Sequence, residues 1–377
     1  MEKEQFKQYL FSFIKLLSLY LNKKEDSSFI IDKSHLSFFY KMAKLHSLRA
    51  ILYLAIKANK VQVEDGILDK LEQYYLAAVK KSLTFQKERK ELYKYLNDND
   101  IDYLPLKGIV IKDYYLDPNS REFADNDILF PDDQSDLVKA FFVNRHYEVE
   151  LYKKSNHDVY LKKPVLNFEM HRALFGETGD NKKNIVYFKD YLKNSPIKEN
   201  KEHYLNKEDF YIYFTAHTYK HFHVSGCGIR TLIDYYLYLK KEDLDFDYIN
   251  KELEKLDLLE FSNQFKNLAL KVFDNEPLNE EEEEILLFIA SSGTYGTMEH
   301  SVDKGVKEKG KFGYFMARVF PPYRFYKSAY PWAYKCPILI PIAWCCRFFR
   351  ILFKNPKKAT SELKMISKHK SGKAHKE

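Results

Sequence analysis

The sequence predicts a helix-rich α+β protein, and three observations carry this prediction. Glycine and proline number only 12 each among 377 residues, and a chain with so few turn formers favours long helices over a many-stranded sandwich. Apolar residues recur at helical spacing through most of residues 1–100, for example at Phe6, Leu10, Phe13 and Leu17. Strand-like apolar runs gather instead between residues 101 and 175.

Changes in residue composition and in apolar spacing along the chain predict five regions. The third helical run, from Leu71 to Leu96, ends at the turn cluster of residues 97–100. Strands are expected at residues 123–130, 147–152, 159–162 and 165–174, with the last three mainly antiparallel. The predicted regions are an N-terminal helical region (1–100), an α/β core (101–175), a helical domain (176–300), a basic aromatic segment (301–353) and a disordered tail (354–377).

Composition and charge exclude several protein classes. Hydrophobic residues make up 45% and charged residues 31%, which excludes disordered chains, collagens and disulfide scaffolds. The net charge is +7, but residues 301–377 hold 18 Lys/Arg and 4 Asp/Glu, so the first 300 residues carry a net −7. A mostly acidic chain is not expected to bind nucleic acid sequence-specifically. The basic tail suits phosphates, lipid headgroups or an acidic partner.

Cysteines and apolar stretches indicate a cytoplasmic protein. The four cysteines, at positions 227, 336, 345 and 346, form no CxxC pair, so we expect reduced thiols. The N-terminal MEKEQFKQYL lacks a signal-peptide pattern. The longest uncharged apolar stretch, residues 336–346, is far below the about 20 residues of a membrane span. We therefore expect a cytoplasmic location without a transmembrane helix, with weak contact of the basic segment with a membrane surface as a further option.

Three carboxylates form the predicted metal site. Asp125 and Asp127 stand two apart on an expected strand and would face the same way. Such a pair repels unless a cation lies between its members, and Mg²⁺ or Mn²⁺ takes carboxylate and phosphate oxygens. On a later strand Glu169 and His171 alternate with apolar residues and could share that face. Glu169 would be the third metal ligand or orient an acceptor hydroxyl; the alternative is a surface strand with exposed acids.

A predicted strand-to-helix corner supplies the phosphate contacts. Lys107 and Gly108 end the apolar run that begins at residue 103. A glycine there lets the backbone approach a phosphate. Lys107 and Arg121 would neutralise a triphosphate. The alternative is a turn glycine beside two solvent-facing bases.

A later helix carries further candidates. His217, Lys220 and His221 share one face at i, i+3 and i+4. They serve either the core and helix ends or contacts with phosphate or acceptor across a cleft. Arg230 and Asp234 are four apart, so they either pair with each other or, like His171, contact the acceptor or support the site from behind its ligands.

The motifs together resemble the uncharacterised bacterial nucleotidyltransferases of the polymerase-beta-like superfamily. The resemblance rests on Leu106-Lys107-Gly108, Tyr115-Leu116-Asp117-Pro118, Arg121, Asp125-Asn126-Asp127, Glu169-Met170-His171, and the later His217, Lys220-His221, Arg230 and Asp234. His46 and the FPPYRFYKSAYPW region add to it, so that it covers most of residues 36–350. It implies a small polymerase-beta-like α/β core flanked by helices, and Mg²⁺-dependent transfer of a nucleoside monophosphate from an NTP to an acceptor hydroxyl.

Two other functions stay open from the sequence. Ile109 follows the corner glycine where the superfamily commonly has Ser or Gly, so a non-catalytic nucleotide-binding or membrane-peripheral adaptor is an alternative. If the corner is placed correctly, Ile109→Ser should be tolerated. A metal-dependent glycosyltransferase also uses a DxD, but it would need a longer parallel nucleotide-binding unit before that motif.

The aromatic residues of the basic segment allow two interpretations. Trp332, Tyr334, Trp344, Phe348 and Phe349 are too many large apolar groups to leave exposed, so the first is that they pack back onto the helical body. The second is a surface that docks on a membrane or an acceptor. Five prolines between residues 321 and 341 prevent one continuous helix in either case.

Overall fold

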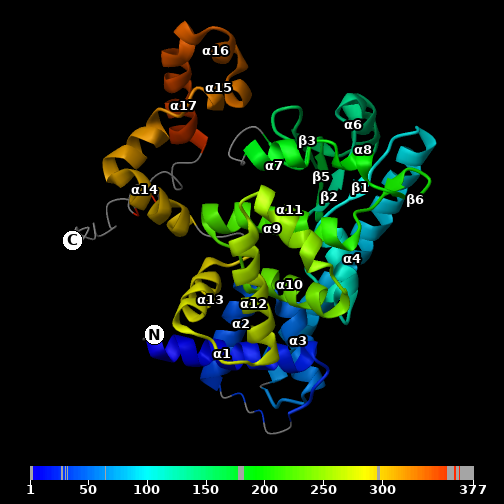
Figure 1. Ribbon diagram of the computed structural model, residues 1–377, viewed down its shortest axis with the longest axis vertical. Coiled ribbons are helices and arrows are strands. Elements are labelled where there is room, and N and C mark those ends of the chain that lie inside the picture. Colours follow the sequence, from blue (N-terminus) through cyan, green and yellow to red (C-terminus); the bar gives the residue numbers. More distant parts are fainter. Residues whose placement is uncertain are drawn as a thin grey trace. The chain divides into compact units, whose positions relative to one another are not determined.

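The computed structural model confirms a helix-rich α+β fold (Figure 1). It describes residues 3–26, 29, 31, 33–63, 65–176, 182–294, 298–354, 361 and 365. Contacts divide the chain into two compact units. Unit 1 comprises residues 1–220 and 227–294, and unit 2 comprises residues 221–226 and 295–377.

Four helices open unit 1, as the apolar periodicity of residues 1–100 predicts. They are α1 (Lys3–Leu21), α2 (Lys33–Leu45), α3 (Arg49–Ala58) and α4 (Asp65–Asp98). Helices α1 and α3 bury apolar faces, as Phe13 and Leu17 of α1 and Ile51 of α3 show. The 34 residues of α4 contain neither proline nor a buried glycine, so nothing interrupts its hydrogen-bond ladder before the predicted turn cluster.

A five-stranded mixed sheet follows. Its strands are β1 (Leu104–Pro105), β2 (Asn126–Leu129), β3 (Glu148–Leu151), β4 (His157–Lys162) and β5 (Leu166–His171), in the order β1-β2-β5-β4-β3. Strands β3, β4 and β5 pair antiparallel, as predicted. Strand β5 also pairs parallel with β2, which places Asp127 beside Glu169.

Short elements connect these strands. They are α5 (Gly108–Ile111), the 3₁₀ turns η1 (Lys112–Tyr114), η2 (Pro118–Ser120) and η3 (Asp132–Gln134), and α6 (Ser135–Asn144). The Asp117 side chain accepts a hydrogen bond from the Asn119 amide and caps η2, so residues 117–120 form a capped 3₁₀ turn.

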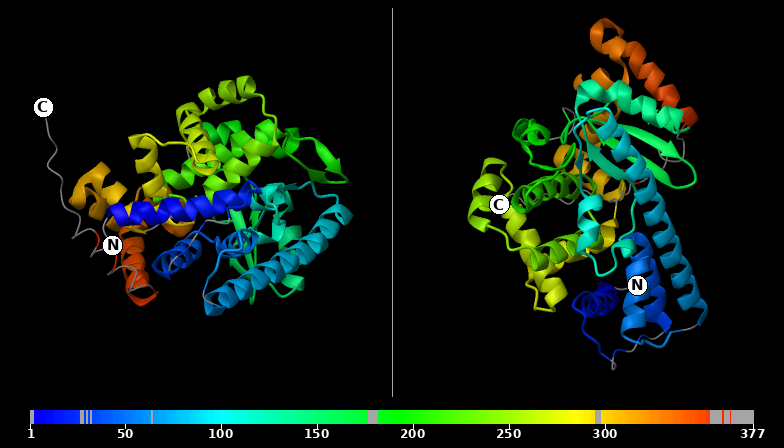
Figure 2. Two further views of the ribbon diagram at one scale, coloured as in Figure 1. Left: turned by 90° about the horizontal axis from the view of Figure 1, so that it is seen from below. Right: turned by 90° about the vertical axis from the view of Figure 1, so that its right-hand side faces the viewer.

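The core lies between one face of the sheet and two helices, α4 and α6. It contains Phe85 and Leu92 of α4, Phe142 of α6, and Ile128 and Phe168 of the sheet, all buried. Helix α4 runs along the sheet in Figures 1 and 2. Because side chains alternate along a strand, burial of Ile128, Phe168 and Met170 sends Asp127, Glu169 and His171 to the opposite face.

The rest of unit 1 is mostly helical. Its elements are α7 (Lys182–Tyr187), α8 (Tyr191–Asn194), β6 (Ile197–Glu199), β7 (Glu202–His203), α9 (Lys207–Ser225, of which residues 221–225 belong to unit 2), α10 (Ile229–Lys241), α11 (Phe246–Lys255), α12 (Leu259–Asp274) and α13 (Glu280–Ser292). Helix α13 begins with a capping box in which the Asn279 side chain accepts from the Glu282 amide and the Glu282 side chain accepts from the Asn279 amide.

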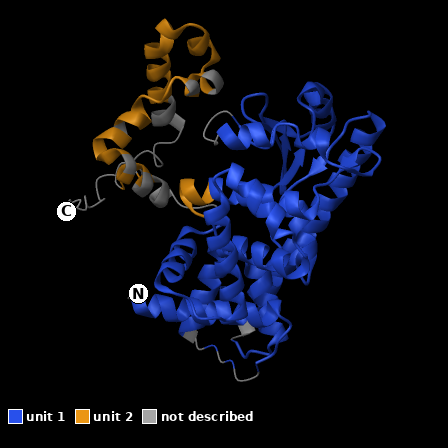
Figure 3. Ribbon diagram, in the orientation of Figure 1, with its two compact units in different colours: residues 1–220, 227–294 blue, residues 221–226, 295–377 orange. Residues whose placement is uncertain are grey.

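Unit 2, drawn in orange in Figure 3, is built from short helices. They are α14 (Met298–Val319), α15 (Arg324–Ala329), α16 (Pro331–Lys335), η4 (Pro337–Leu339) and α17 (Ile340–Lys354). Helix α14 breaks at Gly310, whose φ of 70° is outside the helical range. Prolines begin α16 and η4, so these residues interrupt the helix as predicted.

Two sequence predictions concern the end of the chain. Across the described residues, no helix combines the length and the apolar character needed to cross a bilayer. The predicted disordered tail, 354–377, lies outside the described residues except for positions 354, 361 and 365.

Candidate nucleotidyl-transfer site

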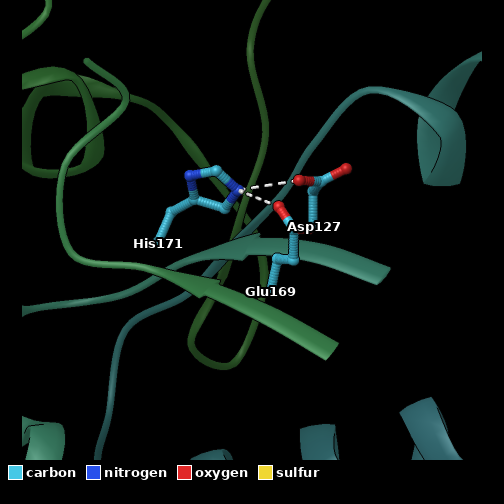
Figure 4. A group of neighbouring side chains, drawn as sticks. All are labelled: Asp127, Glu169 and His171. Carbon is cyan, nitrogen blue, oxygen red and sulfur yellow. Dashed lines mark hydrogen bonds and ion pairs between the residues drawn. The ribbon is translucent and has the colours of Figure 1, made fainter. Parts of the chain in front are cut away.

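Two parallel strands bring the central side chains of the site together. In the β2–β5 register Asp127 lies opposite Glu169, and His171 follows Glu169 by two residues on the same face. One ligand atom from each of these three side chains lies within 4.8 Å of the other two (Figure 4). The sequence predicted the shared face from alternation alone, and the pairing of β2 with β5 turns it into a cluster.

Asp127 is the buried centre of this cluster. Its Oδ1 accepts hydrogen bonds from His171 Nε2 and from Lys107 Nζ, each at 2.7 Å. Burial alone would raise the pKa of Asp127, but the charge of Lys107 and the hydrogen bond from His171 outweigh it and hold the pKa below its ordinary value. Asp127 therefore stays ionised, with Lys107 as its counter-ion.

The other two carboxylates, those of Asp125 and Glu169, have raised pKa values. Burial, and then the charge of Asp127, raise the pKa of Asp125 to about 6. Burial, followed by Asp127 and Asp125, raises the pKa of Glu169 to about 7. Three acids that repel one another in a half-buried cluster favour a bound cation or a proton, and carboxylate oxygens are suitable ligands for Mg²⁺ or Mn²⁺.

Asp125 differs from the prediction in one respect. Strand β2 begins at Asn126, so Asp125 precedes it instead of belonging to it. Its carboxylate is absent from the Asp127–Glu169–His171 cluster, although its pKa responds to Asp127. The buried Asn126 amide oxygen accepts from Arg89 of α4 at 2.7 Å, which fixes the start of the strand.

The corner before α5 places Lys107 over the acids. Lys107 has φ 45° and ψ −115°, a conformation that non-glycine residues rarely adopt. The Leu106 amide donates to the Asp127 carbonyl at 3.0 Å and ties this corner to β2. Burial would lower the pKa of Lys107, but Asp127 raises it above the ordinary value, so the ammonium stays charged. Strained backbone held over a charged cluster is typical of functional sites.

A family comparison covers the segment of the chain that forms this site. A sequence model of the uncharacterised nucleotidyltransferases matches residues 32–274, which is more than half of the chain. The protein belongs to the uncharacterised nucleotidyltransferase family. No curated protein and no solved structure matches the chain.

Arg121 is held by Asp234, a partner that the sequence did not assign to it. Its Nε and Nη2 donate to Asp234 Oδ1 and Oδ2 at 2.9 and 2.8 Å, and both side chains are buried. The predicted pair of Arg230 with Asp234 is therefore wrong, and Arg230 donates to the Glu122 carbonyl instead. Two neighbours along a helix face cannot compete with a bidentate, desolvated partner.

The guanidinium of Arg121 packs closely against Gly108 at the corner before α5. A Cβ on Gly108 would stand 2.6 Å from Arg121 Nη1, and the Asp234 pair keeps the guanidinium from moving away. The glycine is thus required by the close approach of an arginine. The neighbouring Ile109 is buried in the core beside the sheet, so the structure leads us to expect that Ile109→Ser destabilises the protein instead of being tolerated.

Of the three candidates on helix α9, only Lys220 is shown to lie near the acids. Lys220 contributes to the electrostatics of Glu169 and His171, so it lies near the acids, and its Nζ stands 6.0 Å from the centre of the Phe175 ring. The ring of His217 contacts Tyr213, and His221 falls in unit 2.

His46 has a structural place instead. Its Nε2 bonds to the Ala290 carbonyl at 3.0 Å and its Nδ1 accepts from the Ile229 amide at 3.1 Å. Burial lowers the pKa of His46 to about 4, so the ring stays neutral.

Sequence reasoning missed three residues around the acids. His157 lies opposite His171 in the β4–β5 register, with its Nε2 3.8 Å from Glu169 Oε2. The buried Tyr213 hydroxyl has no hydrogen-bond partner among the described residues, and its pKa responds to Lys107 and Asp127. Lys81 of α4 donates to the Phe123 carbonyl at 2.6 Å and lies within electrostatic reach of Asp125. Alternation on β4 could have suggested His157, but only packing brings Tyr213 and Lys81 to the site.

Proposed function

We propose that the protein transfers a nucleoside monophosphate from an NTP to the hydroxyl of an acceptor, with Mg²⁺ or Mn²⁺ bound by Asp127, Glu169 and Asp125. The observation that carries the proposal is the shared sheet face of β2 and β5 in a chain of the nucleotidyltransferase family: Asp127 and Glu169 lie side by side there, and Lys107 binds Asp127. We further propose that the core belongs to the polymerase-beta-like superfamily, that the protein is bacterial, and that it is located in the cytoplasm.

The donor set fits a divalent cation. Burial and, after it, the charge of Asp127 raise the pKa values of Asp125 and Glu169, and two oxygens and one imidazole nitrogen already converge within 4.8 Å. A bound cation would neutralise the acids and draw the phosphate oxygens of an NTP to this face.

The protein's own groups supply the remaining requirements. In this proposal Lys107 exchanges Asp127 for a phosphate oxygen of the NTP, and Lys220 and Lys81 add positive charge nearby. Arg121 positions the corner through its pair with Asp234. Glu169, with its pKa near neutrality, is suited to accept the proton of the attacking hydroxyl or to complete the metal site. Transfer then depends on positioning and charge neutralisation, without a covalent intermediate.

The glycosyltransferase alternative is less well supported by the topology. Helices α1–α4 and the two-residue β1 precede β2, and β2–β5 is the parallel pair of the described sheet. A longer parallel nucleotide-binding unit is therefore missing from the described residues before Asp125.

The test is pyrophosphate release from each of the four NTPs with Mg²⁺ or Mn²⁺, together with calorimetric binding of the same NTPs. Glu169→Gln is the best first variant because it leaves the Lys107–Asp127 pair intact, and Asp133→Asn, at an exposed acid, is the control. We expect Glu169→Gln to lower metal-dependent nucleotide binding or turnover at least tenfold. Nucleotide binding without pyrophosphate release over a range of hydroxyl acceptors would favour the adaptor, and binding of NDP-sugars alone would favour the glycosyltransferase.

A further inference from the structure

Unit 2 has a small core of its own. Tyr326, Ala333 and Ala343 are buried in it, and Tyr334 and Ile340 pack against them. Trp344 closes this core, since its Nε1 donates to the Tyr326 hydroxyl at 2.6 Å and its ring meets Phe320 edge-on at 4.6 Å. Helix α17 therefore turns the face of residues 340, 343, 344 and 347 toward its own unit.

The opposite face of α17 is apolar as well. Ile342 is 53% exposed and Phe349, seven residues later, is 56% exposed. Between them Cys345 and Cys346 are exposed, and in η4 Ile338 is 83% exposed. We call residues 338, 342, 345, 346 and 349 the α17 outer face. It has no charged residue, although a solvent-facing helix side is normally polar.

The aromatic residues of the basic segment differ in their burial within unit 2. Trp344 and Tyr334 do pack against neighbours, but within unit 2. Trp332, Phe348 and Phe349 remain 41%, 61% and 56% exposed. Unit 2 by itself therefore leaves these three aromatic side chains exposed.

The sequence segment that contains the outer face carries charge of one sign. From Glu308 to Glu362 the chain contains no further acid and eleven bases, namely Lys309, Lys311, Arg318, Arg324, Lys327, Lys335, Arg347, Arg350, Lys354, Lys357 and Lys358. The first 300 residues are net acidic, so this charge is confined to the segment that also exposes the apolar side chains.

We propose that the α17 outer face docks on the surface of an anionic lipid bilayer, independently of the function proposed for unit 1. An anionic bilayer satisfies both features at once, since apolar side chains enter the acyl boundary while lysine and arginine reach the headgroups. A second copy of the chain would bring two basic segments together, and a nucleic acid would leave the apolar face without a partner. With 15 residues, α17 lies on the bilayer and does not cross it.

The experiment is co-sedimentation of the full-length protein with vesicles of phosphatidylcholine alone or with one-quarter phosphatidylglycerol, at 50 and 500 mM salt. We expect binding to the anionic vesicles at low salt, at least tenfold less at high salt, and little to the neutral vesicles. The test variant is Ile342→Ser/Phe349→Ser, which should weaken anionic binding at least tenfold. Its control is Leu76→Ser/Leu83→Ser on α4, which removes two similarly exposed apolar residues at the same seven-residue spacing and should change nothing.

Each of the following outcomes would overturn the proposal. Absence of binding to anionic vesicles at low salt rules out the membrane. Loss of melting temperature in Ile342→Ser/Phe349→Ser with unchanged vesicle binding means that the protein itself covers the face. A dimer in sedimentation velocity that this variant abolishes identifies a second copy as the occupant, and vesicle binding that depends on Lys335 and Lys354 but not on Ile342 and Phe349 shows a purely electrostatic contact.

Discussion

Neutralising Arg121 should reveal whether this residue supports the site or binds substrate. Arg121→Met leaves the Asp234 carboxylate buried, with the Tyr115 hydroxyl at 2.5 Å as a remaining donor. The side chains of Arg121 and Asp234 are only 9% and 4% exposed, so water cannot replace the guanidinium. Breaking one side of such a buried pair costs about 3–5 kcal/mol, which corresponds to a fall in melting temperature of about 5 °C or more.

The second variant separates stability from binding. Arg121→Met/Asp234→Asn removes both charges and keeps an acceptor for Tyr115, so it should recover most of the lost stability. Chemical denaturation measures the free energy of unfolding, and calorimetry measures NTP affinity. As a control, Arg145→Met breaks a more exposed pair with Glu88 and should cost at most about 1 kcal/mol.

Two results would refute this reasoning. If Arg121→Met leaves the free energy of unfolding unchanged, the buried pair does not contribute as the structure indicates. If the double variant is as stable as the parent but binds NTP more than tenfold more weakly, Arg121 is itself a phosphate ligand, and its pair with Asp234 only holds it ready.

Three further predictions concern the acids and the corner. The pKa of Asp125 is about 6 in the folded protein against about 3.9 when unfolded, so the metal-free protein should lose stability as pH rises from about 4 to 7. The free energy of unfolding of Asp125→Asn should therefore equal that of the parent at pH 4 and exceed it by about 1–2 kcal/mol above pH 7. Thermal denaturation over this pH range measures the difference, with Asp133→Asn as the control, and a difference that does not change with pH would contradict the prediction. Ile109→Ser should cost about 2–4 kcal/mol in chemical denaturation and Ile109→Val about 0.5–1.5 kcal/mol, because the side chain is in the core; a serine variant as stable as the parent would remove Ile109 from the core. His171 Nε2 donates to Asp127 and could join the acids as a metal ligand once its proton moves to Nδ1. In that case Mn²⁺ should bind more tightly than Mg²⁺, and His171→Gln should reduce that preference in calorimetry. An unchanged Mn²⁺-to-Mg²⁺ affinity ratio would show that the imidazole is not a ligand.

Local patterns in the sequence were enough for much of the architecture. The helices of residues 1–100 follow from apolar spacing, because an amphipathic helix is specified by residues within a few turns of one another. Alternation in residues 166–171 likewise places Glu169 and His171 on the face opposite Phe168 and Met170, whichever strand is the neighbour. The fold class and the side chains that face away from the core could therefore be predicted without a tertiary structure.

Tertiary structure alone decided which charges meet. Asp127 and Glu169 become partners through a parallel pairing across 42 residues, and Arg121 selects Asp234 across 113 residues instead of leaving it to Arg230. Lys107 is bound to Asp127 at 2.7 Å, and Ile109 is buried although it follows the corner glycine. Ion-pair partners and the burial of a single side chain depend on distances between segments remote in sequence and on the water that packing removes, and no local periodicity encodes either quantity.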